Sequence, residues 1–366
     1  MNARLATLAA VVLAACTHAA PVHAAPDAGA WTPKKIPEVL VGAGPNGCAN
    51  YLQDARPVMG TWAELQLCAS GPRELKADAD AAFAELQRVE NLLSTWKATS
   101  EISAVNREAG KQPVHVSPDT FEVLQKAREF SARSDGLFDI TFASLQLWHF
   151  DEDLKAQVPT QEQVKQRLAL VGWQHVVLDA AKQTAFIDRA GTRIDLGGIG
   201  KGFAVDKAVA VLRTRGLHDF VVKAGGDLYC SGKHGERPWK VGVRDPRDDE
   251  GGFFAVMPVQ DAAFSTSGDY ERFFVLGGKR YHHIIDPRTG YPATASRSAT
   301  VLARDATEAE GLTKPAFILG PEAGAAWVQK LGAEAIIVGA DNRLVTTPGL
   351  EGKLEILHPP TAGDGP

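Results

Sequence analysis

The chain has little of what would mark it as a membrane-spanning or nucleic-acid-binding protein. Its 39 lysines and arginines are outnumbered by 44 aspartates and glutamates, so the net charge of −5 leaves no basic excess to hold nucleic acid. After residue 15, no run reaches the roughly 18 uncharged apolar residues that cross a bilayer. The four cysteines form no CxxC pair and no HExxH motif occurs, so a cysteine or Cys/His zinc site is not expected. The chain has 366 residues, and 45% of them are hydrophobic. This is enough for a sizeable core in one or two domains.

The first residues have the pattern of an export signal. Arg4 precedes an apolar run over residues 5–15, which has the length of a signal sequence and is too short for a stable span. The run ends in Leu-Ala-Ala-Cys, which resembles a bacterial lipobox in which Cys16 is lipidated. The alternative is a plain secretory signal cut near residues 19–25, with Cys16 discarded. Either way we expect an exported protein, and the lipobox favours one anchored on the periplasmic face of a bacterial membrane.

Composition divides the rest of the chain. An exported protein permits disulfides, so Cys48 and Cys68 either pair or remain as buried thiols. Ala, Pro and Gly dominate the stretch after Cys16, which is typical of a flexible tether. The predicted parts are a signal peptide at 1–15, a tether at 16–47, a folded body of one or two lobes at 48–357 and a loose tail at 358–366.

Hydrophobic periodicity in the body predicts both helices and strands. Apolar residues spaced three or four apart from Leu75 to Leu93 predict an amphipathic helix, and Ser117-Pro118 opens another with a cap and a first-turn proline. Because short strands and hairpin turns are frequent, we expect an α+β fold with mixed or antiparallel sheets and packed helices. Further helices are predicted at 161–171, 206–213, 307–319 and 323–331, and strands at 56–68, 176–178, 185–188, 193–196, 220–223 and 335–338.

A glycine-rich turn at 195–202 is the first candidate for chemistry. Its four glycines allow backbone N–H groups to approach an anion, and the following helix and Lys201 add positive charge. This combination suits a phosphate, although it matches neither a Walker A loop nor GxGxxG. A solvated lysine in a glycine-rich turn is the alternative.

Three more turns carry polar side chains. Asp227 follows two glycines at the end of a predicted buried strand, and Thr266 lies among small hydroxyls beside a glycine. His282 and His283 point to opposite faces if they lie on a strand, so at most one faces a given site. A histidine near a carboxylate such as Asp286 can act as a general base.

Two upstream side chains also need an explanation. Asp139 lies among apolar neighbours and therefore needs a partner, a ligand or a cap. Trp96 follows a predicted helix end and could stack on a planar ring, although an ordinary core aromatic is the alternative.

Taken in order, these segments resemble the FAD:protein FMN transferase (ApbE) family. The resemblance extends over roughly residues 57–340. The matching pieces are Met59-Gly-Thr, Leu93-Ser-Thr-Trp96 with Ser100-Glu-Ile and Asn106, Gly136-Leu-Phe-Asp139, Asp195-Leu-Gly-Gly-Ile-Gly-Lys-Gly202 with Asp206, Gly225-Gly-Asp227, Thr266-Ser-Gly-Asp-Tyr270, and His283-Ile-Ile-Asp-Pro-Arg-Thr-Gly290.

The resemblance implies an enzyme that binds FAD and, with a divalent ion such as Mg²⁺, transfers FMN to a threonine hydroxyl of an acceptor protein, releasing AMP. Lys201 and the glycine loop would offset the diphosphate charge, and His283 would take the hydroxyl proton. Trp96 would lie against the isoalloxazine. The implied FAD-binding residues are Met59, Trp96, Asp139, Gly198, Gly200, Lys201, Asp206, Asp227, Thr266, His283 and Asp286.

The implied metal site departs from the family pattern. An aspartate and a threonine side chain would bind the metal together with a carbonyl, here that of Gly200, but this chain has Glu310 and Lys314 at those two positions. Protonated lysine cannot ligate Mg²⁺. Its ammonium could instead sit in the metal's place, or it could pair with Glu310 and silence the site. The resemblance therefore leaves two alternatives to the transferase: an FAD pyrophosphatase giving FMN and AMP, and a non-catalytic FAD-binding lipoprotein.

Overall fold

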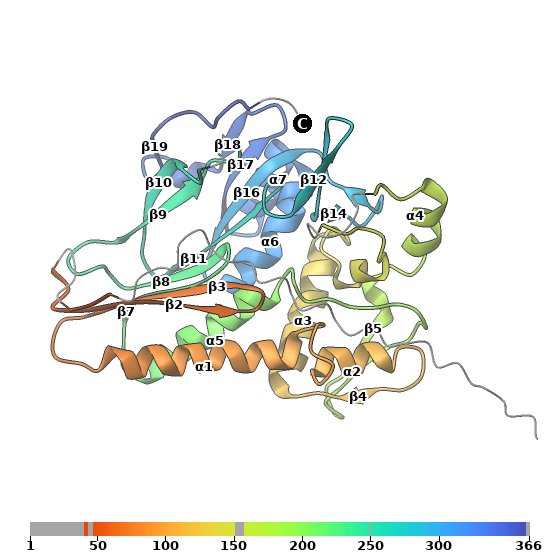
Figure 1. Ribbon diagram of the computed structural model, residues 1–366, viewed down its shortest axis with the longest axis horizontal. Helices are drawn as coiled ribbons and strands as arrows, with labels where there is room; N and C mark the ends of the chain where they lie inside the picture. Colours follow the sequence, from red (N-terminus) through yellow and green to blue (C-terminus); the bar gives the residue numbers. More distant parts are fainter. Residues whose placement is uncertain (1–39, 43–46, 151–156, 249, 364–366) are drawn as a thin grey trace, which may run out of the picture.

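The computed structural model describes residues 40–42, 47–150, 157–248 and 250–363 (Figure 1). The helices are α1 (Leu75–Leu93), α2 (Glu101–Arg107), α3 (Pro118–Arg133), α4 (Gln161–Leu168), α5 (Gly200–Thr214), α6 (Ala306–Leu319) and α7 (Pro321–Lys330). The strands are β1 (Leu40–Gly42), β2 (Asn50–Val58), β3 (Thr61–Ala69), β4 (Val114–His115), β5 (Val176–Asp179), β6 (Thr184–Ile187), β7 (Asp219–Ala224), β8 (Asp227–Ser231), β9 (Trp239–Arg244), β10 (Phe253–Val259), β11 (Ala262–Gly268), β12 (Phe273–Leu276), β13 (Lys279–His282), β14 (Ile285–Asp286), β15 (Tyr291–Pro292), β16 (Ser296–Ala303), β17 (Glu334–Gly339), β18 (Leu344–Thr346) and β19 (Glu355–Ile356).

A nine-stranded sheet forms the centre of the molecule, in the order β1-β2-β3-β7-β8-β11-β16-β17-β18. Each neighbouring pair in it is antiparallel. Hairpins account for many of its connections, as the short strands and turn residues of the sequence predict. The α+β fold class is therefore confirmed.

The sheet is covered on both faces, and alternate residues of each strand enter different cores. In β7, Phe220 and Val222 pack on the helical side, whereas Val221 packs against the small sheet of β9, β10 and β19. In β17, Ile337 and Ile336 divide in the same way. Figure 1 shows α1 and α5 below the central strands, with β9 and β10 above them. The result is three layers: helices, the large sheet and the small sheet.

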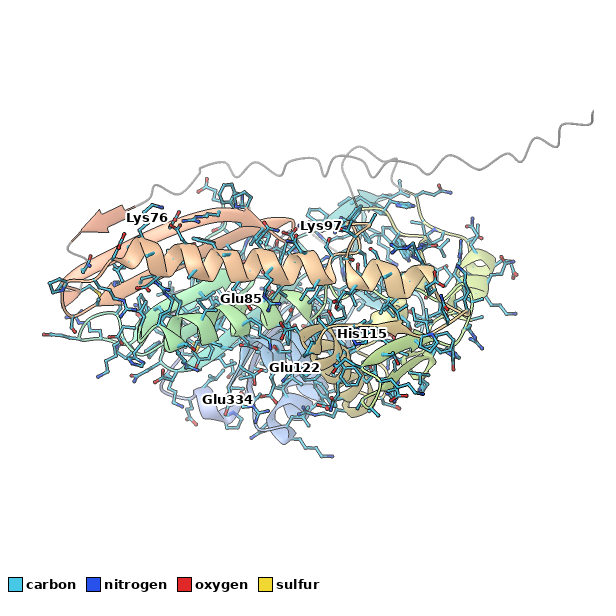
Figure 2. The ribbon with its side chains drawn as sticks, turned by 90° about the horizontal axis from the view of Figure 1, so that it is seen from below. Lys76, Glu85, Lys97, His115, Glu122 and Glu334 are labelled. Atoms are coloured by element: carbon cyan, nitrogen blue, oxygen red, sulfur yellow. A yellow bond between two sulfur atoms is a disulfide. The ribbon has the colours of Figure 1, made fainter. Side chains whose placement is uncertain are left out.

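The helix α1 has the bounds that its apolar spacing predicts. Ala79, Leu86 and Val89 are fully buried on the face that packs against α5 and the sheet. Figure 2 shows α1 running along the molecule, with Lys76 near its first turn and Lys97 just beyond its end. This end of α1 leads directly to Trp96 and so positions one side of the candidate site.

Three local predictions differ from the structure. The predicted strand at 56–68 is two strands, β2 and β3, because Met59 and Gly60 form a two-residue turn with φ of 54° and 67°. Positive φ at both central residues is the geometry of a tight hairpin turn, which glycine favours and methionine does not. Residues 193–196 form no strand, and the helix predicted from Asp206 begins at Gly200.

Both ends of the folded body extend further than predicted. Leu40–Gly42, in the predicted tether, pairs with β2 as an edge strand of the large sheet. In the predicted loose tail, the Thr361 N–H and hydroxyl donate to Asp245 at 2.9 and 2.8 Å, and Arg297 donates to the Ala362 carbonyl at 2.8 Å. The signal peptide, Cys16 and the rest of the predicted tether lie outside the described residues.

The cysteines of the body are accounted for. Cys48 and Cys68 form a disulfide, which resolves the two alternatives left by the sequence. Cys230 is a buried free thiol whose pKa is raised to about 12 by burial. Within the described ranges, no helix is long and apolar enough to cross a membrane.

Candidate functional site

The glycine loop enters α5 without a side-chain cap. Ile199 occupies the N-cap position and makes no capping hydrogen bond, so the first turn of α5 depends on other groups for its N–H donors. Asp195 secures the loop from behind, since its carboxylate accepts from the Gly197 N–H at 2.7 Å and the Thr95 hydroxyl at 2.6 Å. The loop is thereby tied to the end of α1.

The start of α5 lies directly against the start of α6. A Cβ atom at Gly202 would lie 2.3 Å from the Ala306 carbonyl oxygen, so only glycine permits this approach. The close contact brings Glu310 of α6 to the first turn of α5, where its Oε2 accepts from the Gly202 N–H at 2.7 Å. A carboxylate on α6 therefore takes the place of a cap on α5.

Four charged side chains meet at this junction, and we call them the charged cluster: Lys201, Asp227, Glu310 and Lys314. The Lys201 Nζ lies 2.8 Å from Asp227 Oδ2 and also contacts Glu310 Oε1. The Lys314 Nζ lies 3.3 Å from both Glu310 Oε1 and the Glu310 carbonyl oxygen. The remaining oxygen of Asp227 accepts from the Ser265 hydroxyl. The cluster contains two positive and two negative groups and is formally neutral.

Burial and mutual attraction set the charge states of the cluster. Burial alone would lower the pKa of Lys201, but the charges of Asp227 and Glu310 outweigh it and raise that pKa. Burial likewise opposes ionisation of Glu310, yet the two ammonium groups hold its pKa below the ordinary value. Burial and the negative charge of Glu310 raise the pKa of Asp227. Burial lowers the pKa of Lys314, even though the charge of Glu310 opposes this shift.

His283 is the candidate base, and it directly follows the last residue of β13. Its backbone N–H donates to the Arg272 carbonyl at 3.0 Å. The ring Nδ1 is buried and has no hydrogen-bond partner among the described residues. Burial, followed by the charges of His282, Arg272 and Lys314, lowers its pKa to about 3. Lys314 therefore acts electrostatically on His283. The imidazole is neutral at physiological pH.

His282 faces the other way, as the strand pattern predicts. Its Nε2 hydrogen-bonds the Ala293 carbonyl at 2.8 Å, and its Nδ1 accepts from the Ile284 N–H at 3.3 Å. The two ring nitrogens are thus satisfied within the core. His282 is a structural residue, and of the two histidines only His283 has an unsatisfied nitrogen.

Three predicted ligand-binding carboxylates are occupied by hydrogen bonds within the protein. Asp206 accepts from the first N–H groups of α6, those of Ala306 and Thr307, at 2.8 and 2.9 Å, and burial raises its pKa to about 6. Asp139 caps the short helix η2 (Ile140–Ser144) and accepts from the Trp173 N–H at 2.9 Å. Asp286 pairs with Arg288 at 2.7 Å in the β14–β15 turn. We regard all three as positioning residues.

The other predicted residues surround the loop. A Cβ atom at Gly200 would lie 3.7 Å from the Met59 Cε, and one at Gly198 would lie 3.7 Å from the Lys314 Cε. Thr266, on β11, shares a 2.9 Å hydrogen bond with the Thr300 hydroxyl. Trp96 is 64% exposed, so its ring is open to a planar ligand and is not a core aromatic.

Two functional neighbours were missed by reasoning from the sequence. Ser265 stands opposite Asp227 in the β8–β11 pairing and hydrogen-bonds its carboxylate. Thr95 joins the Trp96 segment to the glycine loop. Thr95 lies within a recognised motif and Ser265 directly precedes one, but only the pairing of distant segments assigns them a contact, and no local signal indicates it.

The residues at the implied metal position do not fit a divalent cation. Such ions require several free oxygen ligands. In the charged cluster, each carboxylate oxygen already accepts a hydrogen bond, and Lys314 brings a positive charge where a ligand is expected. Across the described ranges, no group of three or more His, Cys, Asp or Glu side chains could hold a metal. The set Gly200, Glu310 and Lys314 therefore does not make a magnesium site.

Comparison with known proteins agrees with the geometry. The profile of the ApbE family matches residues 59–337, and the chain belongs to that family. The FAD:protein FMN transferase of Treponema pallidum is 33% identical over 87% of this chain and 94% of its own length. That of Escherichia coli K12 is 33% identical over 69% of this chain and 74% of its own.

Solved structures show the same fold. The ApbE protein of Thermotoga maritima superposes with a TM-score of 0.76 at 31% identity, covering 82% of this chain and 98% of its own. The flavin transferase ApbE of Vibrio cholerae gives 0.74 at 27% identity, covering 83% and 99%.

Proposed function

We propose that this protein is an FAD:protein FMN transferase that moves FMN from FAD to a threonine hydroxyl of an acceptor protein and releases AMP. Relatives of that name match most of the chain. The observation that carries the proposal is a glycine-rich loop at the N-terminus of α5, covered by the Lys314 side chain, together with a neutral, unsatisfied imidazole at His283. These are the two requirements of phosphoryl transfer to a hydroxyl.

The reaction exchanges one phosphorus–oxygen bond for another. The threonine oxygen bonds to the phosphorus on the FMN side while the bond from that phosphorus to the AMP oxygen breaks. His283 takes the hydroxyl proton, and AMP leaves with the bridging oxygen and its electron pair. Burial and the Lys314 charge hold the pKa of His283 near 3 in the free protein. The negative diphosphate raises it on binding, which brings the base closer to the pH at which it must act.

The remaining residues bind and orient the substrate. The first turn of α5 and the Lys314 ammonium bind the diphosphate, and Met59, Asp227 and Thr266 shape the nucleotide pocket. The exposed ring of Trp96 stacks on the isoalloxazine. No step is assigned to magnesium, because the residues present do not fit it.

We further propose that the protein is exported and held by lipid at Cys16 on the periplasmic face of a membrane, where its acceptor also lies. The disulfide between Cys48 and Cys68 supports an oxidising compartment. Membrane fractionation of the native chain and of Cys16→Ala tests the anchor, because only the native chain should remain with the membrane.

The transfer itself is tested by mass spectrometry. The protein is incubated with FAD and a threonine-containing acceptor, and an acceptor mass gain of one FMN together with AMP release is expected. AMP and free FMN without an acceptor would instead indicate the pyrophosphatase. Tight FAD binding with neither product would indicate the non-catalytic lipoprotein.

A further inference from the structure

The charged cluster is arranged differently from a site waiting for a metal ion. Glu310 is completely buried, and its side chain touches both ammonium groups and the Gly202 N–H. The Lys314 side chain is 22% exposed and follows Glu310 by one turn of α6. Part of the Lys314 side chain therefore reaches solvent, whereas the carboxylate that it contacts does not.

The balance of charge also disfavours a divalent ion. The two ammonium groups already neutralise the two carboxylates, so an added M²⁺ would leave two uncompensated positive charges beside two lysines. To gain oxygen ligands it would have to displace Lys201 from Asp227, at 2.8 Å, or Lys314 from Glu310, at 3.3 Å. Either step breaks an ion pair whose carboxylate is buried, which is unfavourable.

The Lys314 ammonium is well placed for a phosphate. Its Cε lies 3.7 Å from the point where a Cβ atom of Gly198 would be, so the lysine covers the glycine loop. Lys201 contacts both carboxylates, whereas both contacts of the Lys314 ammonium are to Glu310. One of the three N–H donors of Lys314 therefore remains for an anion that enters over the loop.

We propose that the Lys314 ammonium supplies, in place of a divalent cation, the positive charge that holds the diphosphate of FAD. The inference rests on the proposed function and adds that substrate binding needs no metal. Lys201 is then a positioning residue that holds the two carboxylates, and Glu310 fixes the Lys314 ammonium above the loop.

The test measures FAD binding by flavin fluorescence with EDTA and with Mg²⁺. For the native protein we expect the same affinity in both, and no bound Mn²⁺ by electron paramagnetic resonance in the absence of FAD. Lys314→Met, which removes the charge and adds no ligand, should weaken FAD binding about ten- to hundredfold in both conditions. Lys314→Thr should show a similar loss in EDTA but recover with Mg²⁺.

Two results would overturn the inference: native affinity for FAD that disappears in EDTA, or Mn²⁺ that binds the native protein and is released by Glu310→Gln. Either would leave the proposed transferase intact. If the native protein binds no FAD with or without Mg²⁺, the proposed function itself fails and the inference with it. Should the Lys314 variants not fold, as melting curves would show, the native comparison in EDTA and Mg²⁺ still decides the question.

Discussion

The charged cluster and His283 are neighbours with opposite character. Each carboxylate and ammonium of the cluster has an oppositely charged partner, and Glu310 is completely buried among them. The His283 Nδ1 is also buried, but it has no hydrogen-bond partner within the described residues. The ion-paired side chains of the cluster keep a fixed geometry and a fixed charge. An unsatisfied neutral base is free to receive a proton, so the two regions divide binding from chemistry.

Removing the base should produce the largest effect. We expect His283→Ala to slow FMN transfer by about 10²- to 10⁴-fold, the usual contribution of general-base catalysis, while FAD affinity stays close to native. Single-turnover transfer rates and FAD titrations measure the two quantities separately. Equal losses in both would show that His283 binds substrate and does not act as the base.

The adjacent histidine offers a matched control. His282→Gln removes a ring bonded to the Ala293 carbonyl at 2.8 Å, so it should lower the free energy of unfolding by about 1–3 kcal/mol. FMN transfer by the folded fraction should persist. A collapse of transfer in the folded His282→Gln protein would contradict the division of roles between the two histidines.

Breaking the cluster should mainly affect stability. Glu310→Gln leaves two ammonium groups with a single carboxylate, that of Asp227, which contacts only Lys201, and it should lower the free energy of unfolding by about 3–5 kcal/mol. Urea unfolding measures this. Glu322→Gln is the control, because Glu322 pairs with Arg343 with both side chains 58% exposed, and it should change stability by at most about 1 kcal/mol. Similar losses for the two variants would mean that the cluster is not an integrated network.

Acidification should lower the free energy of unfolding, because the folded protein keeps His283 neutral. Its folded pKa is about 3 and its unfolded value is 6.5, so below pH 6.5 the unfolded state binds the extra proton. The contribution of His283 to stability is complete above pH 6.5 and declines towards pH 3, by up to about 1.4 kcal/mol per pH unit.

Comparison of urea unfolding for the native chain and His283→Phe between pH 7 and 4 isolates this contribution. The folded pKa of Asp206 is raised to about 6, so protonation of this carboxyl favours the folded state as the pH falls below 6. Asp206 is present in both proteins, and its contribution therefore cancels in the comparison. The variant should lose less stability than the native chain on acidification. Parallel curves would show that His283 is not held neutral.

The smallest effect is expected at the exposed edge of the site. Trp96→Ala should weaken FAD binding about two- to tenfold through the lost ring stacking, with no change in melting temperature because the side chain is 64% exposed. Phe253→Ala, on β10 of the small sheet and 50% exposed, should leave FAD affinity unchanged. A melting-temperature loss at Trp96 would indicate packing instead of ligand contact.

Local patterns in the sequence predicted several elements well. The apolar spacing from Leu75 to Leu93 correctly predicted the bounds of α1. Ser117-Pro118 correctly predicted the start of α3, where the Ser117 side chain accepts from the Thr120 N–H. The Met59–Gly60 turn was missed because methionine rarely adopts positive φ, so no turn signal divided the predicted strand. The docked tail was missed because Thr361 is held by Asp245, which is more than a hundred residues away in the chain.

By itself, the sequence determined the α+β class, the helices with strong periodicity and the ordered motifs that place the chain in the ApbE family. Only the tertiary structure decided which of the motif residues remain available to a ligand. Asp206 and Asp139 accept from N–H donors at helix starts, and Lys201 is held between Asp227 and Glu310, because these contacts depend on which segments pack together. A motif names side chains, but their hydrogen-bond partners come from packing between distant parts of the chain.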